Sequence, residues 1–177
     1  MLPDGYDIRP IRQGDSTAVA AAYRRNREHL APWDPDRPES FWTDEGQAAD
    51  VARQVAAGEE GRTYSYLLWY GDAVVGRAML TNLVRGHMQS AVLGYWVDHE
   101  HQGRGLATAV AEHLVGEARQ LGLHRLEAGT MVDNVASQRV LERCGFTRIG
   151  VAEGLLFIQG EWQDHVLYQR LLHDDPL

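Results

Sequence analysis

The segment from Gln102 to Thr108 holds residue types that could bind an anion. Gly103 and Gly105 flank Arg104 directly before an alanine-rich stretch with the period of a helix. The first amides of a helix have no helical partner, and the helix dipole adds about half a positive charge there. Glycine lets a bulky anion approach these amides, and arginine can add a charge-assisted contact. The pattern therefore predicts either a phosphate-binding loop or a tight turn before a helix.

Asn134 and Ser137 begin a second helical segment further along the chain. Both residue types cap helices, so an N-cap is one interpretation of Asn134. Cys144 is interpreted as a small buried hydrophobe, because no base is paired with it for nucleophilic catalysis. Among the 8 histidines, only His99 and His101 stand at ligand spacing, so we predict no metal site.

Hydrophobic periodicity and turn residues predict the elements that must position these groups. We expect strands at 6–10, 63–70, 73–84, 90–97, 123–132, 146–158 and 162–172, and helices at 16–30, 43–57, 106–121 and 134–144. Asp15 or Ser16 is expected to cap the first helix, and Gly145 to end the last one. Early hairpins followed by helical crossovers predict an α/β fold.

The composition is typical of one soluble domain spanning residues 1–177. Hydrophobic residues make up 44% and charged residues 24% of the chain, and no apolar run approaches the roughly 20 residues of a membrane span. The first residues lack the features of a signal peptide, and a single cysteine is typical of the reducing cytoplasm. The net charge of -8 argues against nucleic acid as a partner.

Two segments resemble the signatures of the GNAT N-acetyltransferases. "QGRGLA" at 102–107 matches the Q/R-x-x-G-x-G/A pyrophosphate loop, and "DNVASQRVLERCGF" at 133–146 is similar to the second signature. Within that superfamily, "NREHLAPWDP", "NLVRGHMQSAVLGYWV" and "LLFIQGEWQDHVLY" resemble the RimJ/RimL group, which acetylates N-termini of ribosomal proteins. The resemblance implies a GNAT fold: a mixed, mostly antiparallel sheet with a splayed parallel central strand pair, flanked by helices.

The resemblance implies that acetyl-CoA is the cofactor, with pantetheine in the gap between the two splayed strands. Amides freed near Trp96 would polarise the thioester carbonyl. The residues expected to bind the cofactor are Trp96, Val97, Gln102, Gly103, Arg104, Gly105, Leu106, Ala107, Thr108, Asn134 and Ser137. Ser137 matches a Rim-type serine that is proposed to protonate the departing thiolate. Because a serine hydroxyl is a poor acid, we expect it to hydrogen-bond to the thiolate.

The sequence does not settle which group, if any, acts as the base. Rim-type enzymes have been assigned a glutamate after the Gly-Phe pair, but Leu156 occupies that place here. Glu127 is the candidate catalytic base, acting through a water, and its alternative is an exposed carboxylate on a strand. An α-amine titrates near 7.7–8.0, so water alone is a third possibility.

The acceptor is expected to lie near Asn26, His29 and Trp33, and Arg85 is a further candidate on a turn. For each of these the alternative is a structural or solvated role. The resemblance favours direct transfer, in a ternary complex, to the N-terminal amine of a protein, possibly a ribosomal one. A small amine such as an antibiotic, polyamine or amino acid is the second candidate, and a non-catalytic coenzyme A-binding domain is the third. A homodimer formed through the final strands is also possible by resemblance.

Overall fold

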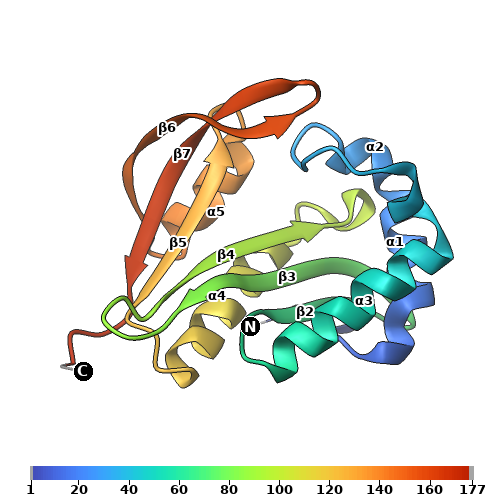
Figure 1. Ribbon diagram of the computed structural model, residues 1–177, viewed down its shortest axis with the longest axis horizontal. Helices are drawn as coiled ribbons and strands as arrows, with labels where there is room; N and C mark the ends of the chain where they lie inside the picture. The colour runs from blue at the N-terminus through green and yellow to red at the C-terminus, as the bar shows by residue number, and fades with distance from the viewer. Residues whose placement is uncertain (1, 176–177) are drawn as a thin grey trace.

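The computed structural model describes residues 2–175, and its strands form one seven-stranded sheet in the order β1-β2-β3-β4-β5-β7-β6 (Figure 1). The strands are β1 (Tyr6–Pro10), β2 (Tyr64–Tyr70), β3 (Ala73–Val84), β4 (Ser90–Val97), β5 (Arg125–Met131), β6 (Thr147–Ile158) and β7 (Glu161–Leu171). The α-helices are α1 (Ser16–Arg25), α2 (Arg27–Leu30), α3 (Asp44–Glu59), α4 (Leu106–Gln120) and α5 (Val135–Arg143), and short 3-10 turns lie at Gln13–Asp15, Glu39–Trp42 and His99–His101. The predicted α/β class and the strand positions are confirmed.

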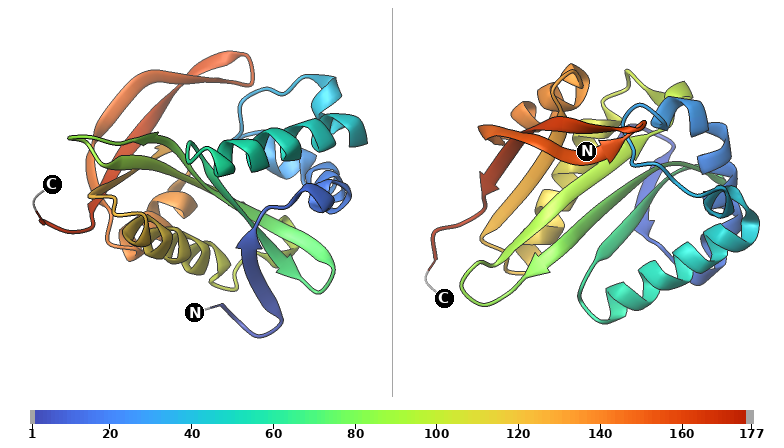
Figure 2. Two further views of the ribbon diagram at one scale, coloured as in Figure 1. Left: turned by 60° about the horizontal axis from the view of Figure 1, so that its bottom comes forward. Right: turned by 45° about the horizontal axis from the view of Figure 1, so that its top comes forward.

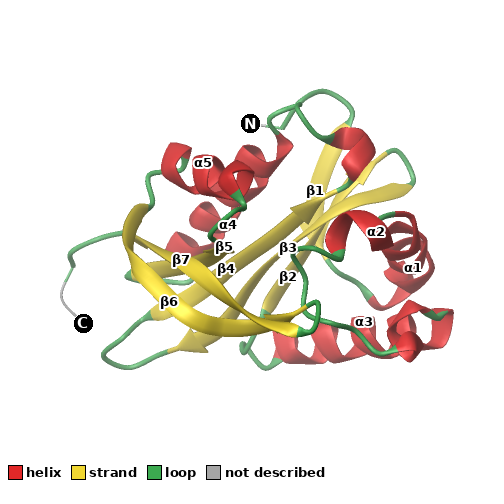
Figure 3. Cartoon of the chain, turned by 90° about the horizontal axis from the view of Figure 1, so that it is seen from above, coloured by secondary structure: helices red, strands yellow, loops and turns green. Residues whose placement is uncertain are grey.

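Helices cover both faces of the sheet, with α1, α2 and α3 on one face and α4 and α5 on the other (Figure 3). Each face has its own hydrophobic cluster. Leu67 and Val74 pack with Val19 and Val51 under α1 and α3. Their sequence neighbours Leu68 and Val75 belong to the cluster that α4 completes. Because successive strand residues point to opposite faces, continuous apolar runs such as "YLLWY" fill both clusters.

The central strands β4 and β5 are parallel but pair only at their beginnings. Ser90, Ala91 and Val92 stand opposite residues 125–127 of β5, and no pairing follows. β4 continues to pair with β3 on its other side as far as Val97, while β5 continues along β7. All other strand pairs are antiparallel. The two strands separate toward one edge, as Figure 2 shows, so the predicted splayed pair is confirmed.

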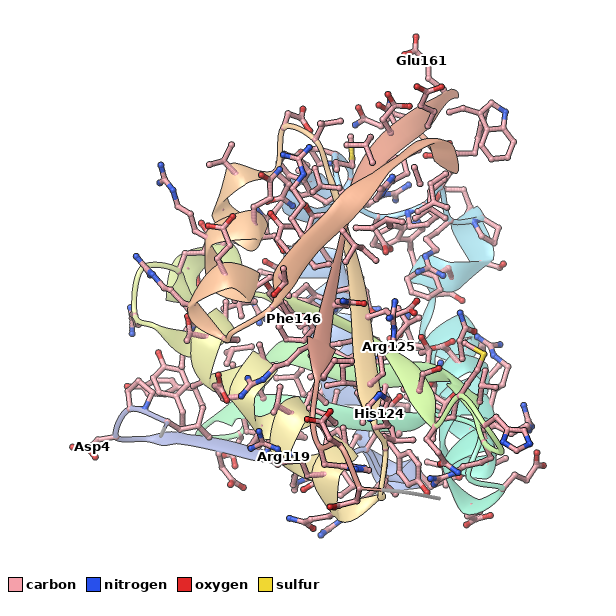
Figure 4. All side chains as sticks on the ribbon, turned by 90° about the vertical axis from the view of Figure 1, so that its left-hand side faces the viewer. Asp4, Arg119, His124, Arg125, Phe146 and Glu161 are labelled. Carbon is pink, nitrogen blue, oxygen red and sulfur yellow. The ribbon has the colours of Figure 1, made fainter. Side chains whose placement is uncertain are left out.

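The hairpin of β6 and β7 extends beyond the sheet toward the loop that follows α2 (Figure 1). Glu161 marks the outer end of this hairpin in Figure 4. The Gln159 amide in its turn donates a hydrogen bond of 3.2 Å to the Asp36 carboxylate. The hairpin and the loop therefore meet, although they are far apart in the sequence.

Two helix predictions need correction. The predicted helix 16–30 is interrupted at Asn26, which separates α1 from α2. Neither predicted N-cap forms a capping hydrogen bond for α1: the Asp15 carboxylate binds Arg9 and the amide of Arg12 instead. By contrast, Thr43 caps α3 by accepting a hydrogen bond of 3.0 Å from the Gly46 amide.

The predicted end of the last helix is confirmed. The amide of Gly145 donates to the Glu142 carbonyl and that of Phe146 to the Leu141 carbonyl, which is the pattern of a glycine-terminated helix. Within residues 2–175, the structure has no helix of the length and hydrophobicity needed to traverse a bilayer.

Candidate functional site

A cavity of about 370 Å³ opens where β4 and β5 separate. This volume lies in the range of small-molecule sites. Its walls come from β3, from both splayed strands, from the β6–β7 hairpin, from the start of α5, from α1 and α3, and from the loop after α2. The lining residues are Tyr23, Trp33, Asp34, Pro35, Arg37, Phe41, Asp50, Arg53, Gln54, Arg77, Met79, Leu93, Gly94, Tyr95, Trp96, Ala128, Gly129, Thr130, Met131, Asn134, Ser137, Leu141, Leu156 and His165.

The glycine loop lies between β4 and α4, as predicted. Gly103 has φ 74° and Gly105 has φ 76°, a left-handed conformation that residues with side chains rarely adopt. A Cβ atom at either glycine would meet no atom of residues 2–175 within 4 Å, so the backbone conformation itself requires glycine. Glycine at these two positions was expected because it lets an anion approach closely. The left-handed backbone is a second reason for glycine, and it holds without any ligand.

The amides of residues 103–108 are free to bind an anion. α4 begins at Leu106 without a side-chain cap, and the Gly105 carbonyl accepts the first helical bond from Ala109. Within residues 2–175, no protein oxygen accepts a hydrogen bond from these six amides. α4 has 15 residues, so its dipole also favours a negative charge at this end. These residues fit the diphosphate of coenzyme A.

Two side chains of the loop are held by other segments. Arg104 donates 2.9 Å to the Tyr6 hydroxyl and 3.3 Å to the Glu100 carbonyl. Gln102 is 3.1 Å from the His29 ring. The predicted contact of Arg104 with an anion stays a prediction.

The start of α5 brings Asn134 and Ser137 to the cavity. The Asn134 side-chain oxygen accepts 3.1 Å from the Ser137 amide, so the N-cap interpretation is confirmed. The Ser137 hydroxyl lies 3.0 Å from that of Tyr95 on β4. Burial raises the pKa of Tyr95 to about 12, so this phenol stays protonated. The hydroxyl pair spans the gap between the two splayed strands.

Sequence reasoning missed Tyr95. The sequence motif points to its neighbour Trp96, whereas the contact of Tyr95 with Ser137 joins residues 42 positions apart. A strand pattern shows which residues share a face, and it does not show which helix residue lies opposite. Only the alternation within "GYWV" hinted that Tyr95 and Trp96 point to opposite sides of β4.

Trp96 and Val97 lie on β4 as expected. The Trp96 ring nitrogen donates 3.2 Å to the Tyr23 hydroxyl, whereas Val97 is buried and pairs with Gly76 of β3. Leu106 is buried and Ala107 packs against the core, so these two residues offer backbone groups only. The carbonyl of Thr108 accepts a weak bond from Cys144, whose thiol pKa is raised to about 11 by burial. A neutral thiol agrees with the structural interpretation of Cys144.

Asn26 is fully buried and does not line the cavity, contrary to the acceptor role predicted for it. Its amide nitrogen donates to Asp98, and its oxygen accepts from the amide of His99. Arg25 also contacts Asp98, at 2.6 Å. Burial alone would raise the pKa of Asp98, but hydrogen bonds from the Asn26 side chain and the Glu100 amide, together with the Arg25 charge, lower it. We call Asn26, Arg25 and Asp98 the junction clamp, since they tie α1 to the glycine loop.

Two further predictions differ from the structure. Arg85 donates 2.7 Å to the carbonyl of Leu121 at the far end of α4, so it does not face the cavity. His29 contacts Gln102 and likewise lies outside the lining. Trp33 alone among the predicted acceptor residues lines the cavity, with 38% of its surface exposed.

Glu127 lies where β4 and β5 are still paired, outside the cavity. Its carboxylate accepts 2.8 Å from Arg125, which Figure 4 labels near the start of β5. This arrangement favours the alternative interpretation, a partly exposed strand carboxylate, and the role of a base stays a prediction. The carboxylates that line the cavity are Asp34 and Asp50, and both are paired with arginines.

Comparison with known proteins agrees with this geometry. A family model described as "Acetyltransferase (GNAT) domain" matches residues 7–147. The [Ribosomal protein uS5]-alanine N-acetyltransferase of Escherichia coli is 32% identical over 173 residues, which is 94% of this chain and 88% of that protein. The chain therefore belongs to the GNAT acetyltransferase family and is an N-acetyltransferase, which confirms the resemblance inferred from its motifs.

Two solved structures extend the comparison. The ribosomal-protein-S5-alanine acetyltransferase from Vibrio fischeri has a TM-score of 0.94 at 28% identity, covering 99% of this chain and 98% of that one. RimJ from Mycobacterium smegmatis, in complex with CoA-disulfide, has a TM-score of 0.87 at 28% identity over 94% of this chain and 81% of that one. The likeness thus includes a relative that binds coenzyme A.

Proposed function

We propose that this protein transfers the acetyl group of acetyl-CoA to the N-terminal α-amine of a protein, and that a ribosomal protein is the acceptor. The observation that carries the proposal is the extent of the likeness to uS5-alanine acetyltransferases. It covers 99% of this chain in the Vibrio fischeri structure, including the loop after α2 and the β6–β7 hairpin on the acceptor side. The amino-acid sequence supports the same proposal, because the uS5-alanine acetyltransferase of Escherichia coli is 32% identical over 94% of this chain.

Acetyl-CoA supplies the activated acetyl group as a thioester. The free amides of residues 103–108 would hold its diphosphate. Asn134 and Ser137 lie beside the gap that would take pantetheine. Residues 93–97 of β4 pair with β3 only, so amides on their other side are available to a developing oxyanion. These groups polarise the carbonyl and need no reorganisation during the reaction.

The amine nitrogen attacks the carbonyl carbon, the carbon–sulfur bond breaks, and one proton moves from nitrogen to the thiolate. Ser137 hydrogen-bonds to the departing sulfur, and the Tyr95 hydroxyl holds the serine side chain. A thiol has a pKa of about 8.5, so its thiolate needs little acid catalysis. Before the attack, the ammonium form of the acceptor loses a first proton to water, because the cavity carboxylates are already paired with arginines.

The test is coenzyme A release from acetyl-CoA with two acceptor panels in one assay. One panel holds N-terminal peptides of ribosomal proteins, and the other holds small amines. Turnover on one or a few peptides is expected, with mass spectrometry placing the acetyl group on the α-amine. Turnover on small amines alone would refute the N-terminal assignment and favour the second candidate. Binding of acetyl-CoA without turnover on either panel would favour a coenzyme A-binding role.

A further inference from the structure

The cavity has a polar floor on the α1 and α3 side that the acetyl-transfer steps above do not use. Arg77 on β3, Asp50 and Arg53 on α3, and Tyr23 on α1 all line the cavity there. Arg77 and Asp50 are almost fully buried, with 4% and 5% of their surfaces exposed. Buried charges are costly unless they are paired, so this floor needs an explanation.

Arg77 has more donors than the protein satisfies. One terminal nitrogen, Nη1, donates 3.1 Å to the Tyr23 hydroxyl and 3.1 Å to Asp50. Its Nε and Nη2 atoms are buried, and neither has an acceptor among residues 2–175. A buried donor without an acceptor loses the hydrogen bond it made to water in the unfolded chain. Nε and one Nη form the guanidinium edge that binds a carboxylate through two parallel bonds.

Tyr23 adds a further donor. Its oxygen accepts from Arg77 and, at 3.2 Å, from the Trp96 ring nitrogen. The hydroxyl proton has no acceptor among the described residues, because both bonds place the donor on the partner. Trp96 belongs to β4, so this hydroxyl lies at the junction of the floor and the splayed strands.

The charged residues that line the cavity also favour a negatively charged ligand. Its lining holds the arginines Arg37, Arg53 and Arg77 but only two carboxylates, Asp34 and Asp50. Asp34 pairs with Arg37, and the two oxygens of Asp50 are taken by Arg53 and Arg77. One positive charge and several donors therefore remain, and no carboxylate oxygen is left for a cation.

We propose that this floor, formed by Tyr23, Arg53 and Arg77 around Asp50, binds a carboxylate of the acceptor. A carboxylate supplies the negative charge and the acceptor oxygens that the floor lacks. It comes either from an acidic side chain near the N-terminus of a protein or from the α-carboxylate of a free amino acid. The first source rests on the proposed function, and the second does not.

The experiment compares kcat/KM for acceptors that differ only in charge. Peptides that begin with alanine carry glutamate or glutamine at the second or third position, and free alanine is compared with alaninamide. We expect the carboxylate member of at least one pair to be preferred by about 10-fold or more, the range of hydrogen bonds to a charged group. Equal kcat/KM within every pair, or preference for lysine over glutamine in further peptides, would overturn the proposal.

Variants identify the floor as the origin of this preference. Arg53→Gln is the main variant, because the Arg53 side chain is 68% exposed and its loss leaves Asp50 paired with Arg77. Tyr23→Phe removes only the hydroxyl, and each variant is expected to reduce the preference to about 3-fold or less. Arg24→Gln is the matched control, since it removes an arginine of α1 that pairs with Asp44 outside the cavity. A preference unchanged in Arg53→Gln and Tyr23→Phe would place recognition elsewhere and overturn the proposal.

The outcomes also separate this site from the proposed function. Peptide turnover without charge discrimination refutes the carboxylate site and leaves N-terminal acetylation standing. Turnover of free alanine but not of alaninamide or any peptide refutes N-terminal acetylation of proteins and supports the carboxylate site.

Discussion

The cofactor side and the acceptor side of the site are built in different ways. The cofactor side, residues 98–108 with the start of α5, offers mainly backbone amides in a contiguous loop. The acceptor side is formed by α1, α3, the loop after α2 and the strands of the β6–β7 hairpin, and it offers side chains from these separate segments. A ligand common to a whole family can be held by backbone geometry, whereas an individual acceptor has to be read by side chains. Mutations should therefore affect the two sides differently.

The largest effect is expected at the junction clamp that connects the two sides. Asp98→Ala leaves Arg25 and Asn26 without their shared partner, and removal of one member of a buried pair costs about 3–5 kcal/mol of unfolding free energy. Denaturant unfolding measures this loss. Asp72→Ala, on an exposed turn, should change stability by about 0.5 kcal/mol or less.

The same clamp predicts a pH dependence with a definite sign. The folded-state pKa of Asp98 lies below its ordinary value, so its contribution is complete above about pH 4 and is lost as pH falls through the folded pKa. Unfolding curves below about pH 4 should therefore show a smaller difference between wild type and Asp98→Ala than at neutral pH. An equal difference at both pH values would contradict this role of the carboxylate.

Next in size is the loss of Ser137. Ser137→Ala should lower kcat by about 100-fold. This is the lower end of the effect of acid catalysis, and we expect no larger loss because a thiolate is a good leaving group. The dissociation constant of acetyl-CoA, measured by calorimetry, should change little. Ser40→Ala, at an exposed site outside the cavity, is the matched control. Full kcat in Ser137→Ala would exclude a direct role.

A backbone change tests the cofactor side. Gly105→Val places a β-branched side chain at φ 76° and should weaken acetyl-CoA binding by about 10-fold or more, since a left-handed residue costs about 1–2 kcal/mol. Gly150→Ala is the control, because a Cβ there also meets no protein atom and the backbone has no positive φ. The preference among acceptors should stay unchanged in both variants. A changed preference in Gly105→Val would show that the cofactor side and the acceptor side do not act independently.

Tyr95→Phe should have a smaller effect, about 3- to 10-fold on kcat, because it removes one hydrogen bond to Ser137. Since Tyr95 acts through Ser137, the double variant should be no slower than Ser137→Ala alone. Additive losses would show that the phenol acts independently.

The smallest effect is expected for Glu127→Gln. Its carboxylate pairs with Arg125 at a partly exposed site, and such pairs contribute about 0–1 kcal/mol. Both kcat and its pH profile should remain close to wild type. A loss of the basic limb of that profile would restore Glu127 as the base.

Sequence reasoning succeeded where the determinants are local. The glycine loop, the Asn134 cap and the parallel strand pair follow from contiguous motifs and the resemblance they carry. It failed where contacts between distant parts of the chain determine the position of a side chain. Asn26 and Arg85 are polar residues near loops, and only the fold shows that one is buried against Asp98 and the other bound to Leu121. Tyr95 and Arg77 were missed because strand patterns do not specify the residue across a cavity.

The short pairing of β4 and β5 also has a mechanical consequence. Three residue pairs, beginning with Ser90 and Arg125, join a four-stranded sheet, β1 to β4, to a three-stranded one, β5 to β7. A molecule seated between the two sheets bridges them beyond that short join. Acetyl-CoA should therefore stabilise the folded state by holding the two sheets together. At a concentration 100 times its dissociation constant, it should raise the unfolding free energy by about 2.7 kcal/mol. Hydrogen exchange in residues 93–97 should slow at the same time, so the rigidity of this enzyme would follow the acetyl-CoA level around it.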